Sequence, residues 1–93
     1  MNKLSIGDVV ISLKGRDKDR PYLVCEIDKD FAYIVDGKVR KVTSKKKKNV
    51  KHLKKVEGAT EKELALKIQN GYPVGNDRVS RAVKAVKKII RED

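Results

Sequence analysis

The stretch KVRKVTSKKKKNVKHLKKV, residues 38–56, combines dense positive charge with spaced apolar residues. It holds nine lysines, one arginine and no acidic residue, a formal charge of +10 against +11 for the whole chain. Five apolar residues are spread through it: Val39, Val42, Val50, Leu53 and Val56. A solvated basic tail would not need them. We therefore predict two segments of folded backbone on either side of a basic loop at residues 44–49.

The composition is that of one small folded protein with a polyanionic partner. The chain has 93 residues, of which 39% are hydrophobic and 40% charged, and valine, isoleucine and leucine are well spaced. This length suits a single domain. The net charge of +11 and a pI near 9.9 indicate nucleic acid first and an anionic membrane second. The alternative is a lysine-rich surface that serves only solubility.

The chain carries no sequence sign of export or membrane insertion. Cys25 is its only cysteine, which excludes an intramolecular disulfide and suits a reducing compartment. The N-terminal residues lack the apolar core of a signal peptide, and no run approaches the ~20 apolar residues of a membrane span. We expect a cytoplasmic protein with no membrane partner.

The pattern of apolar residues in 1–57 predicts five short strands. Alternating apolar residues indicate strands at 8–13, 22–27, 31–35 and 39–43, and residues 50–56 form a fifth strand or a 3₁₀-like turn. Asp36-Gly37 is a strong two-residue hairpin signal between the third and fourth strands. Five short strands at this spacing favour a small closed or nearly closed barrel.

Individual positions in these strands carry further predictions. In the first strand Val9, Ile11 and Leu13 should share the buried face, preceded by Gly7 where the backbone comes close. Cys25 lies in the apolar row of the second strand, so we expect a buried small hydrophobe and not a nucleophile. Adjacent like charges repel, so we predict a loop for the lysine run. Its members are Lys45, Lys46, Lys47 and Lys48.

A second basic segment lies at residues 14–20. Lys14, Arg16, Lys18 and Arg20 occupy every second position, with Gly15 to turn the chain. Asp17 and Asp19 reduce the net charge of the segment to +2. Arg16 and Arg20 suit bidentate phosphate binding. The alternative is a solvated loop whose charges pair among themselves.

After Gly58 the pattern changes to two helices, so we predict a barrel unit at 1–57 and a helical appendage at 58–93. Thr60 and Glu63 have the spacing of a capping box, Leu64 and Ile68 follow on one face, and Gly71 is a plausible stop. Asn76 or Asp77 would begin a second helix that runs to about Arg91. Its apolar stripe is Val79, Ala82, Val83, Val86, Ile89 and Ile90, and its basic side is Arg78, Arg81, Lys84, Lys87, Lys88 and Arg91. The last turn, with Glu92 and Asp93 at the negative end of the helix dipole, should fray.

Three roles remain open for these helices. They would cover the open end of the barrel, dock a protein partner or a second copy, or form a helix-turn-helix with Arg78 and Arg81 at its reading helix. Two helices alone make a poor helix-turn-helix core, so the DNA role is the weakest.

The N-terminal half resembles the KOW motif of SH3-like RNA-binding domains. The resemblance rests on IGDVVI at 6–11, KGRDKDR at 14–20 and YLVCEID at 22–28. YIVDGKVR at 33–40 and KHL at 51–53 look like small bacterial KOW proteins, which are similar to a group of archaeal and eukaryotic large-subunit ribosomal proteins. The resemblance covers roughly residues 4–55.

The resemblance implies an SH3-like barrel that binds RNA through the basic turn of the motif. In this chain that turn contains Gly15, Arg16, Lys18 and Arg20. Many KOW turns have a second glycine near the end of the loop, where this chain has Asp19. The helices after Gly58 lie outside the motif.

Counterion release supplies the physical basis for RNA binding, since each lysine or arginine that neutralises a phosphate frees condensed cations. Phe31 and Tyr33 share a strand face, but in a small barrel such residues more often belong to the core than form a platform on which bases stack. Folded RNA is therefore favoured over single strands.

His52 is expected at a strand edge, where it stacks on RNA, donates a hydrogen bond to RNA, or merely packs. The predicted RNA-binding residues are Lys14, Gly15, Arg16, Lys18, Arg20, Lys38, Arg40, Lys41, Lys45, Lys46, Lys47, Lys48, Lys51, His52, Lys54 and Lys55.

No motif supports catalysis or a cofactor. His52 and Cys25 provide at most two soft ligands, whereas structural zinc normally takes four. A nucleophile–base–acid set and the phosphate-binding glycine motifs are missing. We therefore predict a non-enzymatic protein without metal or cofactor.

The sequence thus favours a mainly β protein, with an SH3-like barrel of about five strands followed by two helices, that binds structured RNA. Ribosomal RNA of the large subunit is the expected target by resemblance. The alternatives are a protein-interaction adaptor that uses the barrel and the C-terminal helices, or a DNA-binding or anti-termination accessory protein.

Overall fold

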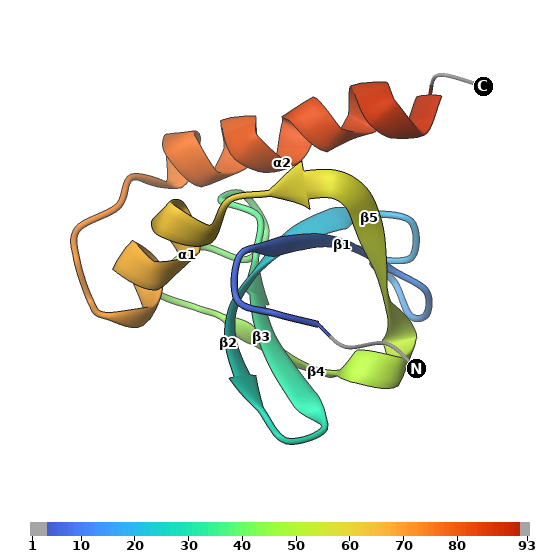
Figure 1. Ribbon diagram of the computed structural model, residues 1–93, viewed down its shortest axis with the longest axis horizontal. Helices are drawn as coiled ribbons and strands as arrows, with labels where there is room; N and C mark the ends of the chain where they lie inside the picture. Colours follow the sequence, from blue (N-terminus) through green and yellow to red (C-terminus); the bar gives the residue numbers. More distant parts are fainter. Residues whose placement is uncertain (1–3, 92–93) are drawn as a thin grey trace.

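The computed structural model describes the backbone of residues 4–91 and the side chains of residues 4–85. The strands are β1 (Asp8–Ser12), β2 (Pro21–Asp28), β3 (Phe31–Val35), β4 (Lys46–Asn49) and β5 (Leu53–Thr60), with a 3₁₀ turn η1 (Val50–His52) before β5. Helices α1 (Lys62–Gln69) and α2 (Asn76–Arg91) follow. The strands form one antiparallel sheet in the order β4-β3-β2-β1-β5, which curls into a small barrel-like shape (Figure 1). The predicted fold class is confirmed.

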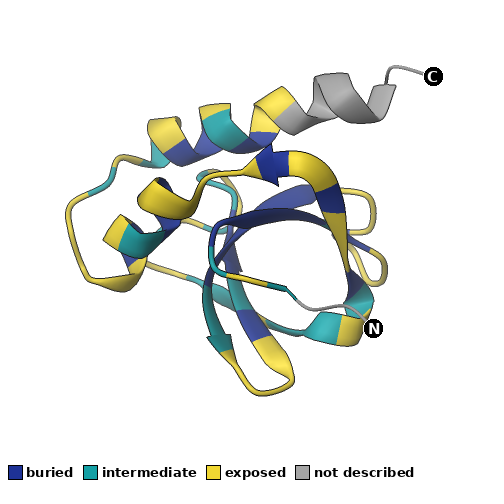
Figure 2. Ribbon diagram, in the orientation of Figure 1, coloured by how far each residue is buried: buried dark blue, intermediate teal, exposed yellow. Residues whose placement is uncertain are grey.

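The sheet separates two apolar cores. The barrel interior contains Val10, Tyr22, Val24, Ala32, Ile34 and Leu53. The other core lies between the sheet and the helices and contains Val9, Leu23, Cys25, Val35, Val56, Ala59, Leu64, Ala65, Ile68, Val79 and Val83. Strand β1 and the first five residues of β2 are therefore buried on both faces, as the dark blue ribbon of Figure 2 shows. This is why the adjacent Val9 and Val10 are both buried, although alternation predicted a half-buried strand.

The prediction that Leu13 shares the buried face with Val9 and Ile11 is wrong, and β2 does not keep one face along its whole length. Leu13 lies beyond the end of β1, where its N–H donates to the His52 carbonyl oxygen, and its side chain is 40% exposed. In β2 a register shift between Val24 and Glu26 marks a bulge at Cys25. Beyond the bulge Ile27 packs against the barrel interior, whereas Leu23 and Cys25 face the helices.

The fourth strand is not where the apolar pattern predicted it. Residues 39–43 form no strand, and the lysine run that was predicted as a loop forms β4, paired with β3 from Phe31–Asn49 to Ile34–Lys46. The strand is at the edge of the sheet, the one position where charged residues, lysine above all, are well tolerated. Alternation sends successive lysines to opposite faces, which separates the like charges.

Residues 36–45 instead form an irregular segment against the helices. The Asp36 carboxylate accepts from the N–H groups of Lys38 and Arg40, at 2.9 and 2.8 Å, and closes a turn wider than the predicted two-residue hairpin. The Val42 N–H donates to the side-chain oxygen of Asn76 at 2.9 Å. The Val42 N–H therefore finds its hydrogen-bond acceptor on helix α2 and not on a neighbouring strand.

The predicted boundary at Gly58 lies inside β5, which runs on to Thr60. Thr60 pairs with Asp8 of β1, and Glu61 precedes α1 without a side-chain cap, so the predicted capping box is wrong. Gly7 allows the close approach expected of it: an added Cβ would lie 2.8 Å from the Lys62 nitrogen. The Glu61 N–H donates to the Gly7 carbonyl oxygen at 2.7 Å, and β1 therefore positions the start of α1.

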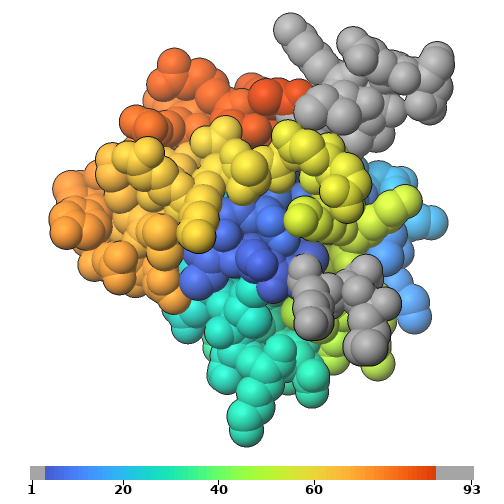
Figure 3. Space-filling model, viewed as in Figure 1, coloured from blue at the N-terminus to red at the C-terminus, as the bar shows by residue number. Residues whose placement is uncertain are grey.

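The two helices lie together on one side of the sheet and form a continuous surface with β5 (Figure 3). Gly71 ends α1 as predicted: the N–H groups of Gly71 and Tyr72 donate to the carbonyl oxygens of Ile68 and Lys67. In α2 the buried Val79 and Val83 confirm the first part of the apolar stripe. The side chains of Val86, Ile89 and Ile90, of the basic Lys87, Lys88 and Arg91, and of Glu92 and Asp93 lie outside the described residues.

Candidate nucleic-acid interface

A buried ion cluster connects the 14–20 loop to β4. The Asp17 carboxylate, only 9% exposed, accepts from Lys48 Nζ at 2.7 Å and from Lys46 Nζ at 2.9 Å. The Ser12 hydroxyl donates to the same carboxylate at 2.8 Å. Lys48 Nζ also donates to the Lys14 carbonyl oxygen at 2.8 Å and to Ser12 Oγ. The lysine run therefore holds the 14–20 loop in place.

The electrostatics of this cluster favour an ionised Asp17. Burial by itself raises the pKa of this carboxyl group. Hydrogen bonds from Lys48, Lys46 and Ser12, together with the positive charge of Lys48, outweigh burial and hold the pKa well below its usual range. Asp17 therefore stays negative and neutralises part of the charge that Lys46 and Lys48 bring.

The other two lysines of the run have different surroundings. Lys47 Nζ lies 4.4 Å from the centroid of the Phe31 ring, a cation–π contact. Lys45 Nζ lies 4.0 Å from Glu26, a weak and partly exposed ion pair. The four lysines predicted as a basic loop thus divide by partner: Lys46 and Lys48 pair with Asp17, Lys45 lies near Glu26, and Lys47, the one exposed member, lies over Phe31.

The structure brings four predicted cationic residues together around a hollow of about 350 Å³, which we call the arginine hollow. Its lining is Arg16, Asp17, Arg20, Tyr22, Val39, Arg40 and Lys46. The cations come from three segments: the 14–20 loop, the 36–45 segment and β4. Three guanidinium groups around one hollow suit the planar, bidentate recognition of phosphate oxygens.

The arginine hollow contains one negative charge, that of Asp17, and this charge is paired with Lys46 and Lys48. Burial, and after it the charges of Asp17 and Asp36, raise the pKa of Tyr22 to about 12, so the phenol is neutral near pH 7. Asp17 is engaged by two lysines. Val39, in contrast, exposes 60% of its surface beside the cations and offers an apolar contact.

The remaining predicted residues are distributed around this centre. The Lys14, Gly15 and Lys18 positions are exposed on the same loop as Arg16, and Lys38 and Lys41 are exposed on the 36–45 segment. Lys51 and His52 lie in η1, and Lys54 and Lys55 are exposed on β5. Lys55 Nζ lies 3.7 Å from Asp8. The arginine hollow therefore unites only a quarter of the predicted set: Arg16, Arg20, Arg40 and Lys46.

His52 and Cys25 show no sign of a reactive group. Desolvation, followed by the positive charges of Lys14, Lys51 and Lys48, lowers the pKa of His52. Burial raises the pKa of the Cys25 thiol to about 11, and Cys25 Sγ donates to the Tyr33 carbonyl oxygen at 3.3 Å. The prediction that Cys25 is a buried hydrophobe is confirmed.

The described part of the chain contains neither a candidate metal cluster nor a helix that could span a membrane. Residues 4–91 contain no group of three or more His, Cys, Asp or Glu side chains placed to hold a metal ion. Within the same residues, neither helix has the length and apolar character needed to cross a membrane.

Sequence reasoning missed the residues that organise the interface. Asp17 was predicted to reduce the loop charge or to pair within the loop, and Ser12 and Val39 were predicted only as parts of strands. An acidic residue inside a basic loop is the one available signal for such pairing, but it does not name the partner. The partners, Lys46 and Lys48, are 29 and 31 residues away.

Comparison with known proteins adds no family assignment: no protein-family model and no curated protein matches this chain.

Proposed function

We propose that this protein is a non-enzymatic binder of structured RNA, with ribosomal RNA of the large subunit as its target in the cytoplasm. The observation that carries the proposal is the arginine hollow, where Arg16, Arg20, Arg40 and Lys46 converge from three segments. Cations held on a folded frame bind phosphates with a smaller loss of side-chain entropy than cations on a mobile tail. The net charge of +11 adds long-range attraction to any polyanion.

The backbone of the 14–20 loop supports the same proposal. Asp19, at the place where many KOW turns have a second glycine, has a φ of 71°, the left-handed conformation that glycine favours. Its N–H donates to the Ser12 carbonyl oxygen at 2.8 Å. A glycine at this position would adopt the same φ without strain, and this supports the proposed resemblance to the KOW turn.

The proposal is tested by binding of the protein to purified large-subunit ribosomal RNA at several salt concentrations. We expect a steep loss of affinity with salt, and we expect Arg16→Ala and Arg40→Ala each to reduce the log–log salt slope by roughly one phosphate contact. Co-migration of the unmodified protein with the large subunit in a ribosome gradient at low salt, and its release at high salt, is expected in parallel.

Lys67→Ala is the matched control, because Lys67 is exposed on α1 and makes only a 3.9 Å contact with Glu63. It should change the affinity less than twofold. A salt slope near zero for the unmodified protein, or arginine variants that behave like Lys67→Ala, would contradict the proposal. Equal affinity for duplex DNA of the same sequence would favour the DNA-binding alternative.

One observation favours a second candidate function, the protein-interaction adaptor. A hollow of about 550 Å³ lies between Val42 and the α1–α2 connection, with Tyr72, Pro73 and Val74 in its lining. Tyr72 is 63% exposed there. An acidic peptide that displaces RNA from the protein as effectively as unlabelled RNA does would support the adaptor.

A further inference from the structure

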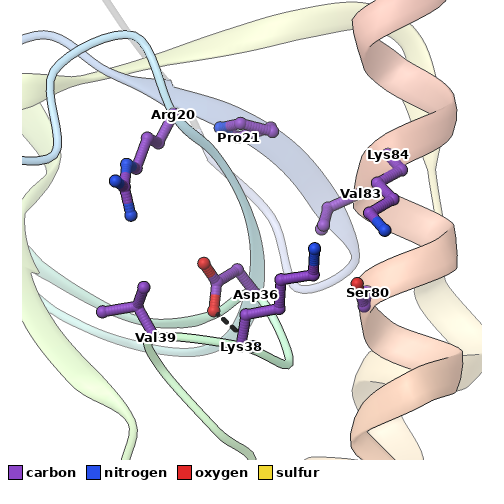
Figure 4. Close-up of a pocket in the computed structure, with 8 residues that line it drawn as sticks. All are labelled: Arg20, Pro21, Asp36, Lys38, Val39, Ser80, Val83 and Lys84. Carbon is purple, nitrogen blue, oxygen red and sulfur yellow. Dashed lines mark hydrogen bonds between the residues drawn. The ribbon is translucent and has the colours of Figure 1, made fainter.

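A second cation-lined hollow lies between the barrel and α2. It has a volume of about 260 Å³, and we call it the helix hollow. Figure 4 shows its lining: Arg20, Pro21, Asp36, Lys38, Val39, Ser80, Val83 and Lys84. The cationic side chains come from the 14–20 loop, the 36–45 segment and α2. Asp36 is the one acidic residue drawn, and its carboxylate is hydrogen-bonded to the Lys38 and Arg40 N–H groups.

The two hollows adjoin each other. Arg20 and Val39 line both, so Arg20 can bind an anion on either side while Val39 forms the ridge between them. Together the hollows form a track of six cations, which are Arg16, Arg40, Lys46, Arg20, Lys38 and Lys84. An apolar ridge between two cationic hollows is complementary to a nucleic-acid strand, in which a sugar and base separate successive phosphates.

Helix α2 also fixes the segment that carries Lys38 and Arg40. Gly37 has a φ of +79° and packs directly on α2: an added Cβ would lie 2.8 Å from the Ser80 nitrogen and would overlap the Asn76 carbonyl oxygen. The Asn76 side chain accepts from the Val42 N–H at 2.9 Å. Both ends of the segment are thus held on the first turns of the helix.

We propose that α2 is part of the RNA-binding surface, and that one RNA backbone strand crosses from the arginine hollow to the helix hollow over Val39. The arginine hollow takes one phosphate, and Lys38 and Lys84 take another in the helix hollow. Sugar or base packs on Val39. This inference rests on the proposed RNA-binding function and assigns the C-terminal helix a direct role in it.

An acidic peptide fits the track less well. Carboxylates of neighbouring residues point to opposite sides of an extended chain, whereas the phosphates of one strand follow each other along one edge. A phosphate also offers more oxygens to a guanidinium fork than a single carboxylate does.

The test compares Lys84→Ala with Lys67→Ala, two exposed helical lysines of which only Lys84 lies on the track. The probe is large-subunit ribosomal RNA. Alanine is the best helix former, so both variants should keep the fold, which thermal unfolding followed by circular dichroism verifies. We expect Lys84→Ala and Lys38→Ala each to weaken binding roughly threefold to tenfold at low salt and to lower the salt slope by about one contact. Lys67→Ala should stay within twofold of the unmodified protein.

The outcomes separate this inference from the proposed function. If Arg16→Ala weakens binding while Lys84→Ala behaves like Lys67→Ala, the role of α2 is refuted and RNA binding stands. If Lys84→Ala and Lys67→Ala weaken binding equally, the helix contributes only general attraction, and the inference also fails. If the unmodified protein does not bind the RNA, both the proposed function and this inference are refuted.

Discussion

Asp17 is the residue on which the geometry of the candidate interface depends most. It is the buried acceptor for two lysines of the run and for Ser12, and it holds a basic loop against a basic strand. Without it, Lys48, whose side chain is only 10% exposed, would keep a buried charge without a carboxylate partner. Breaking a buried ion pair by removing one partner usually costs more than the pair itself contributes.

We therefore expect Asp17→Asn to lower the free energy of unfolding at pH 7 by about 3 kcal/mol. Urea unfolding measures the difference. The control is Asp19→Asn, which lies two residues away, is exposed and has a positive φ that asparagine tolerates well. Asp19→Asn should be neutral or slightly stabilising. Two equally destabilised variants would show that the 14–20 loop, and not the ion cluster, is responsible.

The difference in stability between the unmodified protein and Asp17→Asn should depend on pH. The pKa of Asp17 is lower in the folded protein than in the unfolded chain, so its contribution is complete above the unfolded value of about 3.9 and is lost as the pH falls toward the folded value. The stability gap to Asp17→Asn should shrink by about 1.4 kcal/mol per pH unit below about 3.9. A gap that stays constant down to pH 2 would contradict the depressed pKa.

At the scale of elements, β4 shows how a lysine run becomes a strand. Its edge position supplies hydrogen bonds to β3 on one side only, and its alternation places Lys46 and Lys48 toward Asp17 and Lys47 toward Phe31. The strand therefore has a structural face and a face that is open to solvent. The two faces should respond differently to substitution.

Lys48→Met, which keeps the length of the side chain and removes its charge, should lower the free energy of unfolding by about 2 kcal/mol, since it takes away a buried partner of Asp17. Lys47→Ala should cost about 0.5 kcal/mol, the value of a partly exposed cation–π contact. Urea unfolding of the two variants provides the measurement. Equal losses would mean that alternation along β4 does not divide the lysines in this way.

The whole molecule is built around two cores that share β1 and β2. The core beneath the helices combines Leu23 and Val35 of the sheet with Leu64, Ile68 and Val79 of the helices. Residues 1–57 and 58–93 were predicted as two units, but the second core takes side chains from both. Removal of the helices would expose the apolar side of β1 and β2 to water.

We therefore expect one cooperative unfolding transition for the full chain. Tyr22, 1% exposed inside the barrel, reports on the sheet through near-ultraviolet circular dichroism, and the signal at 222 nm reports chiefly on the helices. The two melting curves should coincide, and a fragment of residues 1–60 should not give a cooperative transition. Separate midpoints, or a stable fragment, would establish two independent units.

Features that depend on neighbouring residues were predicted from the sequence, and features that depend on distant residues were not. Strands β2 and β3, the end of α1 at Gly71 and the extent of α2 were predicted because periodicity, turn residues and glycine act locally. Alternation failed for β1, where two cores meet, and for Ile27, where a bulge reverses the faces. The capping box failed because Thr60 was needed in the sheet. In the candidate site, the cationic residues were predicted, but not which of them converge.

The amino-acid sequence by itself determined that this protein is a small, strongly basic, mainly β protein with two helices at its C-terminal end, because charge, composition and local periodicity are properties of neighbouring residues. Only the tertiary structure decided that the lysine run is a strand, that Asp17 holds it, and that Lys84 of α2 shares a track with Arg20 and Lys38. Each of these depends on residues that are 12 or more positions apart, 29 and 31 for Asp17 and its two lysines, and that meet only when the sheet curls and the helices pack on it.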